Sequence, residues 1–64
     1  MASYLYIDGN GDYVQTTHHP TREEKQLVLN GEYACIRLRD GMFEEMIVFE
    51  GSLDIDWQKV MVSE

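Results

Sequence analysis

Disulfides, proline-rich segments and long hydrophobic runs are all absent from this chain. It has one cysteine and one proline, and its longest apolar run is Met46-Ile47-Val48-Phe49. A single cysteine has no partner within the chain, and it fits a reducing compartment better than a secreted scaffold. A bilayer-spanning helix needs about 20 apolar residues, and the first residues lack the basic and apolar regions of a signal peptide. We therefore expect a cytoplasmic protein.

Basic residues are scarce as well. Five Lys and Arg stand against 12 Asp and Glu, which gives a net charge of −7. Residues 40–64 hold seven acids and one base, so this segment alone carries −6. Phosphate backbones and anionic membranes need cationic contacts from a protein that binds them. We therefore do not expect nucleic acid or membrane to be a direct partner.

The length predicts a single small domain over residues 1–64. A chain of this size buries only about 60% of the surface that its unfolded form exposes, so disulfides, a metal or a partner subunit commonly complete its core. The hydrophobic share of 44% is ordinary for a protein that folds. Since no disulfide can form within the chain, a homodimer is one candidate for what completes the core.

The first part of the chain has the pattern of a β-hairpin. Residues 3–7 are rich in aromatic and β-branched side chains, and residues 12–17 resume that chemistry. Between them, Asp8-Gly9-Asn10-Gly11 supplies the residues that tight turns require. We expect a hairpin over residues 3–17.

The middle of the chain allows two interpretations. Thr21 and Glu24 have the spacing of a capping box, which predicts a short helical turn near residues 21–26. Asn30-Gly31 between apolar runs is a strong hairpin signal, which would pair residues 27–29 with 33–36. In the alternative, Gly31 ends a helix over residues 22–29. We favour the hairpin.

Asp40-Gly41 predicts a second two-residue turn, preceded by a strand with a period of two. We expect Ile36 and Leu38 to point into the core, and Arg37 and Arg39 to point outward.

The same turn sets the register of the strand that follows it. A two-residue loop places Leu38 opposite Phe43, and it then sets the inward Ile36 against Glu45. That pairing conflicts with burial of Ile36, so we expect a β-bulge at Glu44-Glu45 that restores the apolar pairing.

The last part of the chain predicts another strand. Gly51-Ser52 forms a turn, and Leu53, Ile55 and Trp57 share one face of the strand. Residues 60–62 continue this strand beyond an irregularity at residues 58–59.

Together, these segments predict an all-β fold with one short helical turn near residues 21–26. We expect a small antiparallel meander of five or six strands, either barrel-like or two-layered.

No motif in the sequence carries chemistry. The Asp8–Asp12 segment resembles the start of a calcium loop, but the residues that should follow do not match it. His18, His19 and Cys35 lack the spacing of zinc ligands, and no serine lies in a nucleophile elbow. We predict no enzymatic activity, no catalytic residue, no metal site and no cofactor, and we interpret Cys35 as a small hydrophobic core residue.

The acidic surface is the feature that suggests a function. Outward acids in residues 40–56 would form a face that resembles a phosphate backbone, and aromatic side chains are common anchors of interfaces. We predict a protein-binding module, in particular an inhibitor that occupies the basic site of a nucleic-acid-binding protein. The predicted contact residues are Glu44, Glu45, Glu50, Asp54, Asp56 and Trp57. For Trp57, a place in the core is an equal alternative.

Two other functions remain open. Exposed strand edges and the apolar Met46–Phe49 run suggest a self-assembling structural or accessory protein. A small RNA-binding barrel is the third hypothesis, with a stacking and phosphate-binding surface made of Tyr4, Tyr6, Tyr13, Arg37 and Arg39.

Overall fold

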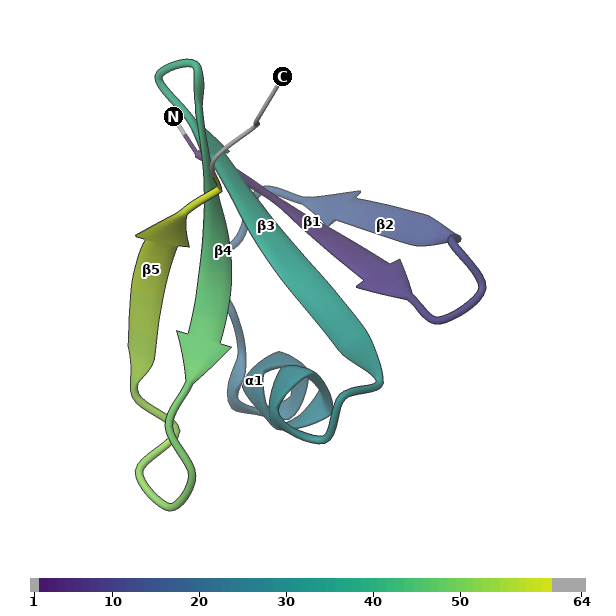
Figure 1. Cartoon of the computed structure of the whole chain (residues 1–64), viewed down its shortest axis with the longest axis vertical. Helices are drawn as coiled ribbons and strands as arrows, with labels where there is room; N and C mark the ends of the chain where they lie inside the picture. Colours follow the sequence, from purple (N-terminus) through teal and green to yellow (C-terminus); the bar gives the residue numbers. More distant parts are fainter. Residues whose placement is uncertain (1, 61–64) are drawn as a thin grey trace.

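The computed structural model describes residues 2–60 as one sheet with one helix (Figure 1). The sheet has five strands in the order β2-β1-β3-β4-β5, and all neighbouring strands are antiparallel. The elements are β1 (Ser3–Asp8), β2 (Tyr13–Thr16), α1 (Arg22–Leu29), β3 (Tyr33–Arg39), β4 (Met42–Val48) and β5 (Ile55–Lys59).

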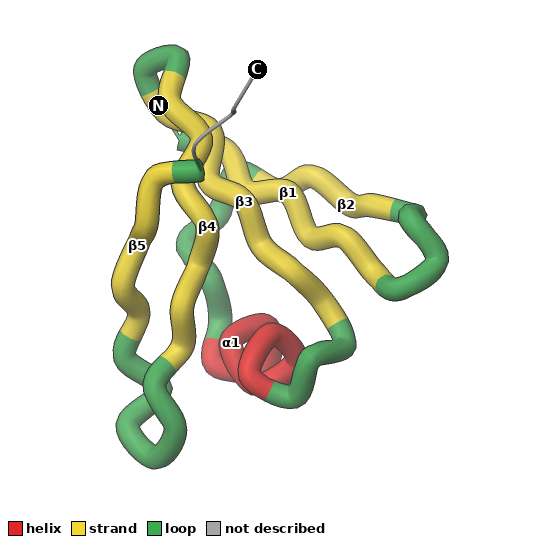
Figure 2. The backbone as a smooth tube through the Cα atoms, in the orientation of Figure 1, coloured by secondary structure: helices red, strands yellow, loops and turns green. Residues whose placement is uncertain are grey.

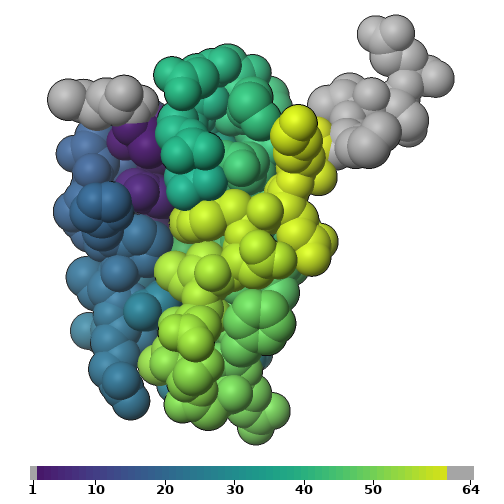
Figure 3. Space-filling model, turned by 90° about the vertical axis from the view of Figure 1, so that its left-hand side faces the viewer, coloured from purple at the N-terminus to yellow at the C-terminus, as the bar shows by residue number. Residues whose placement is uncertain are grey.

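The small antiparallel β fold with one short helix is confirmed. The chain leaves β2 at one edge, passes through α1 and returns to the middle of the sheet as β3 (Figure 2). Barrel closure is not found, because β2 and β5 are the two edges of the sheet within residues 2–60. Figure 3 looks onto the β5 side, where that strand lies at the surface. The predicted continuation at residues 61–62 lies outside the described residues.

The hairpin over residues 3–17 is also confirmed. β1 and β2 pair from Tyr4 opposite Thr16 to Ile7 opposite Tyr13. In the turn, the Asp8 carboxylate accepts hydrogen bonds from the amides of Asn10 and Asp12 at 2.9 and 3.0 Å. A local side-chain acceptor of this kind is what stabilises an Asx turn, so the turn residues need no bound ion to explain them.

The helix is longer than expected, and the hairpin predicted at Asn30-Gly31 is wrong. Both bonds of the Thr21–Glu24 capping box are present, so this prediction is confirmed. At the other end, Gly31 has φ +81°, and the amides of Gly31 and Glu32 donate to the carbonyl oxygens of Val28 and Leu27. This pair of bonds is a Schellman motif. Gly31 therefore provides the left-handed residue that ends a helix, not the turn of a hairpin.

The turn between β3 and β4 follows the prediction, but the bulge does not. Asp40 and Gly41 both have positive φ, 51° and 75°, as a type I′ hairpin turn requires. The register is regular, and Ile36 lies opposite Glu45 with no bulge at Glu44-Glu45. The conflict that suggested a bulge is absent because Ile36 points away from the core.

The side assignment for β3 is likewise wrong. The Arg37 side chain lies on the helix side of the sheet and is 14% exposed. Ile36 and Leu38 lie on the opposite side and are half-buried. The alternation itself is correct, but apolarity alone does not show which side of the sheet the core occupies.

The last strand begins later than expected. β5 starts at Ile55, and Leu53 lies in the preceding loop with φ 58° and a buried side chain. Ile55 and Trp57 do share one face, as predicted, and both pack against the core.

The core lies between α1 and one side of the sheet. Its buried cluster is Tyr4, Tyr6, Cys35 and Met46, with Val28 of α1 packed against it. We call this side the covered face and the other side the open face, because in Figure 1 the helix lies on one side of the sheet only. The single helix within residues 2–60 is too short to cross a membrane.

Candidate protein-interaction face

The open face carries a row of apolar side chains that no described element covers. The strand registers place Leu5 beside Ile36, and Leu38 beside Phe43, on this face. Phe43 is 52% exposed, and Tyr13 is 67% exposed. The apolar members of the open face are Leu5, Ile7, Tyr13, Ala34, Ile36, Leu38, Phe43 and Ile47.

The centre of this row is hollowed. Leu5, Ile36, Leu38, Phe43 and Val60 line a depression of about 250 Å³. All five side chains are apolar, so the depression offers no directional hydrogen bond to a small polar substrate. Contiguous apolar patches at the surface of small proteins are often sites of interaction, which makes this face a candidate.

The charged residues of the open face are all acidic. Glu45 and Asp56 lie on it, next to Gln58 and Ile47. The five basic residues lie elsewhere. Two are on α1 and two are on the covered side of β3. Lys59 lies opposite Glu44 in the register of β4 and β5, on that same side. The open face therefore combines an apolar centre with negative charge at its β4–β5 side.

The prediction that Glu44 points outward is wrong. Glu44 is 8% exposed on the covered face. Its Oε1 accepts hydrogen bonds from Arg37 Nε and Nη2 at 3.0 and 2.8 Å, and Arg39 Nη2 lies 3.7 Å away. A buried carboxylate is tolerated when a charged donor compensates it, and the sequence offers that donor directly across the strand pair. Glu44 is therefore a structural residue of the covered face.

Trp57 belongs to the covered face as well. Its ring lies 4.3 Å below the Arg37 guanidinium and 5.9 Å from the Tyr4 ring. This cation–π contact holds the Arg37 guanidinium over the apolar surface of the indole ring. Of the two alternatives for Trp57, the structure supports the core position, with the ring half-buried.

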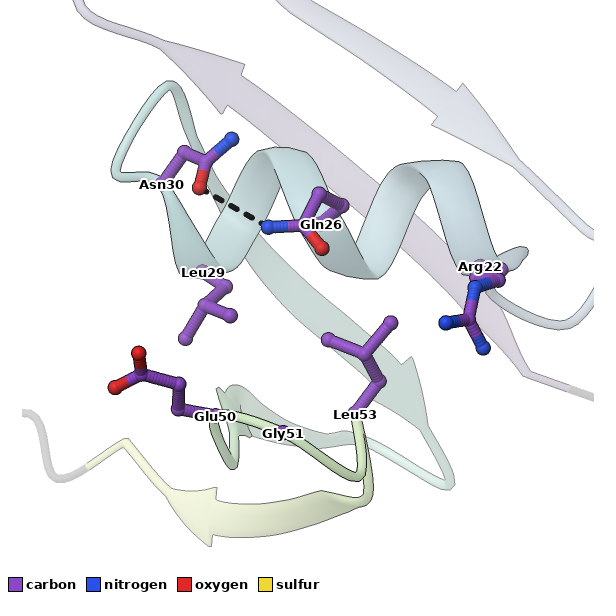
Figure 4. A pocket seen from close by; sticks show the side chains of 7 residues that line it. All are labelled: Arg22, Gln26, Leu29, Asn30, Glu50, Gly51 and Leu53. Atoms are coloured by element: carbon purple, nitrogen blue, oxygen red, sulfur yellow. Dashed lines mark hydrogen bonds between the residues drawn. The ribbon is translucent and has the colours of Figure 1, made fainter.

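Glu50 and Asp54 lie in the loop between β4 and β5. Glu50 borders a hollow of about 490 Å³ between this loop and α1, with Arg22 at its far end (Figure 4). The other lining residues are Gln26, Leu29, Asn30, Gly51 and Leu53. Asp54 is exposed and directly precedes β5. The six predicted contact residues are thus divided among two faces and a loop, and only Glu45 and Asp56 lie on the open face.

Burial makes the covered-face thiol and phenol unsuited to acid–base chemistry. Cys35 is fully buried, as predicted, and burial raises its pKa to about 11. Burial also raises the pKa of Tyr6, with Cys35 and Glu24 close by. A thiol that stays protonated is a poor nucleophile.

The histidines contact neighbouring side chains and not each other. His18 Nε2 lies 3.0 Å from Glu24 Oε2, and His19 Nδ1 lies 3.3 Å from the Tyr4 hydroxyl. Within residues 2–60 there is no cluster of three or more His, Cys, Asp or Glu that could hold a metal ion.

The aromatic surface required for RNA stacking is not formed. Tyr4 and Tyr6 are buried beneath α1 and the loop that leads to it, and Arg37 is engaged with Glu44. Tyr13 is the exposed member of that predicted set of tyrosines.

The open face was missed because its residues were assigned to the core. One signal could have revealed it: β3 has apolar residues at both odd and even positions, and an eight-residue helix is long enough to cover only one face.

Comparison of the chain with models of protein families, with curated sequences and with solved structures finds no match to any of them.

Proposed function

We propose that this chain is a non-enzymatic protein-binding module whose contact surface is the open face of the sheet. The observation that carries this proposal is the apolar depression around Ile36 and Phe43, bordered by Glu45 and Asp56. Five strands about 4.8 Å apart give a face about 20 Å wide. That width suits a protein surface better than a small molecule.

The partner is a protein with an apolar surface bordered by lysine or arginine. The acids of the open face require cations opposite them, and residues 40–64 add a field of the same sign. A nucleic-acid-binding protein with a basic site is the class that fits this description, and the module would act as its inhibitor. Direct binding to nucleic acid or membrane is not part of the proposal, nor is a cofactor. We place the module in the cytoplasm on the basis of its single thiol.

The test compares variants that change charge by the same amount on different surfaces. Tagged wild type, Glu45→Lys/Asp56→Lys, and the control Glu23→Lys/Glu32→Lys are used in parallel to capture proteins, with elution by salt. Glu23 and Glu32 are exposed and lie at the two ends of α1, away from the open face. A Phe43→Ser variant tests the apolar centre.

The proposal requires a basic protein that the wild type and the control both retain. The open-face charge variant and Phe43→Ser must lose it. If the control loses the protein equally, net charge alone governs binding and the open face has no special role. If Phe43→Ser retains it fully, the apolar depression is not the contact surface.

A second candidate function is self-assembly. It is favoured by a separate observation, the two edges of the sheet that pair with no further strand within residues 2–60, and it uses different residues.

A further inference from the structure

The two edges of the sheet differ in charge. β5 carries Asp56 and Lys59, whereas no charged residue lies between Tyr13 and Thr17 on the β2 side. Charged side chains on an edge strand protect it from pairing with another chain. β2 lacks that protection, and Tyr13 and Val14 are 67% and 60% exposed.

The backbone groups at the free side of β2 follow from its pairing with β1. The Asp8 N–H donates to the Asp12 carbonyl oxygen at 2.9 Å, and Val14 pairs with Tyr6 one step further along the ladder. Hydrogen-bonded pairs alternate in an antiparallel ladder, so Val14 and Thr16 direct their backbone groups toward β1. The N–H and C=O groups of Tyr13 and Gln15 therefore face outward, and Thr17 continues that row.

We take a second copy of the chain as the occupant of this edge, because the charge distribution makes repulsion between two copies weaker here than at the β5 edge or the open face. Each copy carries −7, and residues 40–64 contribute −6 of it. β4 and β5 lie at the opposite end of the sheet from β2. Pairing β2 with β2 keeps the acidic parts of two copies as far apart as the fold allows. Packing two open faces together would instead bring Glu45 and Asp56 of both copies into one interface.

We propose that two copies pair edge to edge through β2, antiparallel, about a two-fold axis at Gln15. Gln15 then lies opposite Gln15 of the second copy, and Tyr13 lies opposite its Thr17. The two five-stranded sheets become one continuous sheet. This dimer rests on the second candidate function, self-assembly, and gives it a specific edge and residues. It uses other residues than the open face, so the open-face proposal and the dimer can each fail without the other.

The first test uses the self-opposition that a two-fold axis imposes. Gln15→Lys and Gln15→Glu each place like charges directly opposite each other, so each variant alone weakens the dimer by about fivefold. An equimolar mixture of the two restores association, because a lysine then faces a glutamate. Gln58→Lys, on the same face of the opposite edge strand, is the matched control and leaves the dissociation constant unchanged. Sedimentation equilibrium gives each constant, and circular dichroism checks the fold.

The second test removes one outward amide. Gln15→Pro deletes a donor that does not bond to β1, so the fold tolerates it, while both symmetric inter-chain bonds are lost and the dimer weakens by about thirtyfold. The control is Lys59→Pro at the other edge. Its amide also faces outward, because the Val60 amide donates inward to the Phe43 carbonyl oxygen.

Three results would overturn the proposal. One is a wild-type chain that stays monomeric up to about 1 mM. Another is a wild-type dimer that the Gln15 variants do not weaken. The third is a mixture of Gln15→Lys and Gln15→Glu that associates no better than either variant alone.

Discussion

The two faces of the sheet are made of alternate residues of the same strands, and they differ in which side chains are buried. The covered face buries a charged pair, whereas the open face exposes apolar side chains. The covered face buries Tyr4, Tyr6 and Met46, and with them the ion pair of Arg37 and Glu44. The open face leaves apolar side chains such as Phe43 exposed, and within residues 2–60 its acids form no ion pair with a base. Apolarity alone therefore does not decide which side of a small sheet becomes the core.

What decides it is the position of α1. The chain between β2 and β3 contributes one helix, and that helix packs against β3 and β4 on one side. A charged pair beneath it is stable because its hydrogen bonds and the Trp57 ring compensate the loss of water. The open face has no second layer in residues 2–60, which leaves its apolar surface exposed.

Thiol labelling gives the largest expected contrast between the faces. Cys35 is fully buried with a pKa of about 11, so a disulfide reagent at pH 7 reaches it only when the fold opens. We compare it with Ala34→Cys/Cys35→Ser, which moves the thiol by one residue to the open face. The open-face thiol should react about a thousandfold faster. Absorbance of the released thiolate measures both reaction rates. Equal rates for the two thiols would mean that the covered face is accessible to solvent.

A pair of neighbouring glutamates gives the next largest effect. Glu44→Gln leaves the Arg37 guanidinium without its charged partner on the covered face, and we expect a loss of about 3 kcal/mol in the free energy of unfolding. Glu45→Gln makes the same chemical change on the open face and should shift it by less than about 0.5 kcal/mol. Urea denaturation of both variants measures the difference. Similar losses would contradict the assignment of the faces.

Acid should weaken the helix that separates the faces, with a smaller effect. Burial alone would raise the pKa of Glu24, but hydrogen bonds from the Thr21 amide and His18 outweigh it and lower the pKa. A lowered pKa means that the carboxylate stabilises the fold above its unfolded pKa of about 4.3, and that this contribution is lost as the pH falls further.

The matching variant is Glu24→Gln, which should cost about 1 kcal/mol at pH 7 through loss of the charged cap. The difference from wild type should shrink as the pH falls below about 4.3, because the wild-type carboxyl then becomes progressively protonated. Glu23→Gln, in the same turn without the capping bond, serves as the control. A pH-independent difference would show that the charge of Glu24 has no part in the cap.

Local sequence signals predicted the turns and the strand pairs that those turns join. Asp8–Gly11 and Asp40-Gly41 carry residues that favour tight turns, and the helix start was evident from the Thr21–Glu24 capping box. The end of the helix was not, because Asn30-Gly31 is compatible both with a hairpin and with a helix terminus. Local chemistry cannot separate the two when the outcome depends on what the segment packs against.

The candidate site was predicted only in part for a related reason. Alternation shows which residues share a face, and it correctly grouped Ile36 with Leu38 and Ile55 with Trp57. The side on which α1 docks is a tertiary property, and reversing it exchanges the core and the surface for every residue of β3. Glu44 was therefore assigned to the surface and Ile36 to the core.

The strand order also has a consequence for how the molecule folds. β3, β4 and β5 follow one another along the chain, so their contacts close short loops, whereas β1 must find β3 from Ser3 opposite Leu38 to Asp8 opposite Tyr33. Contacts between residues far apart in sequence cost more entropy to close and slow folding. We expect the three consecutive strands to assemble early, and β1, which brings Tyr4 and Tyr6, to dock late. The strand that is synthesised first, β1, would then dock last and complete the hydrophobic core.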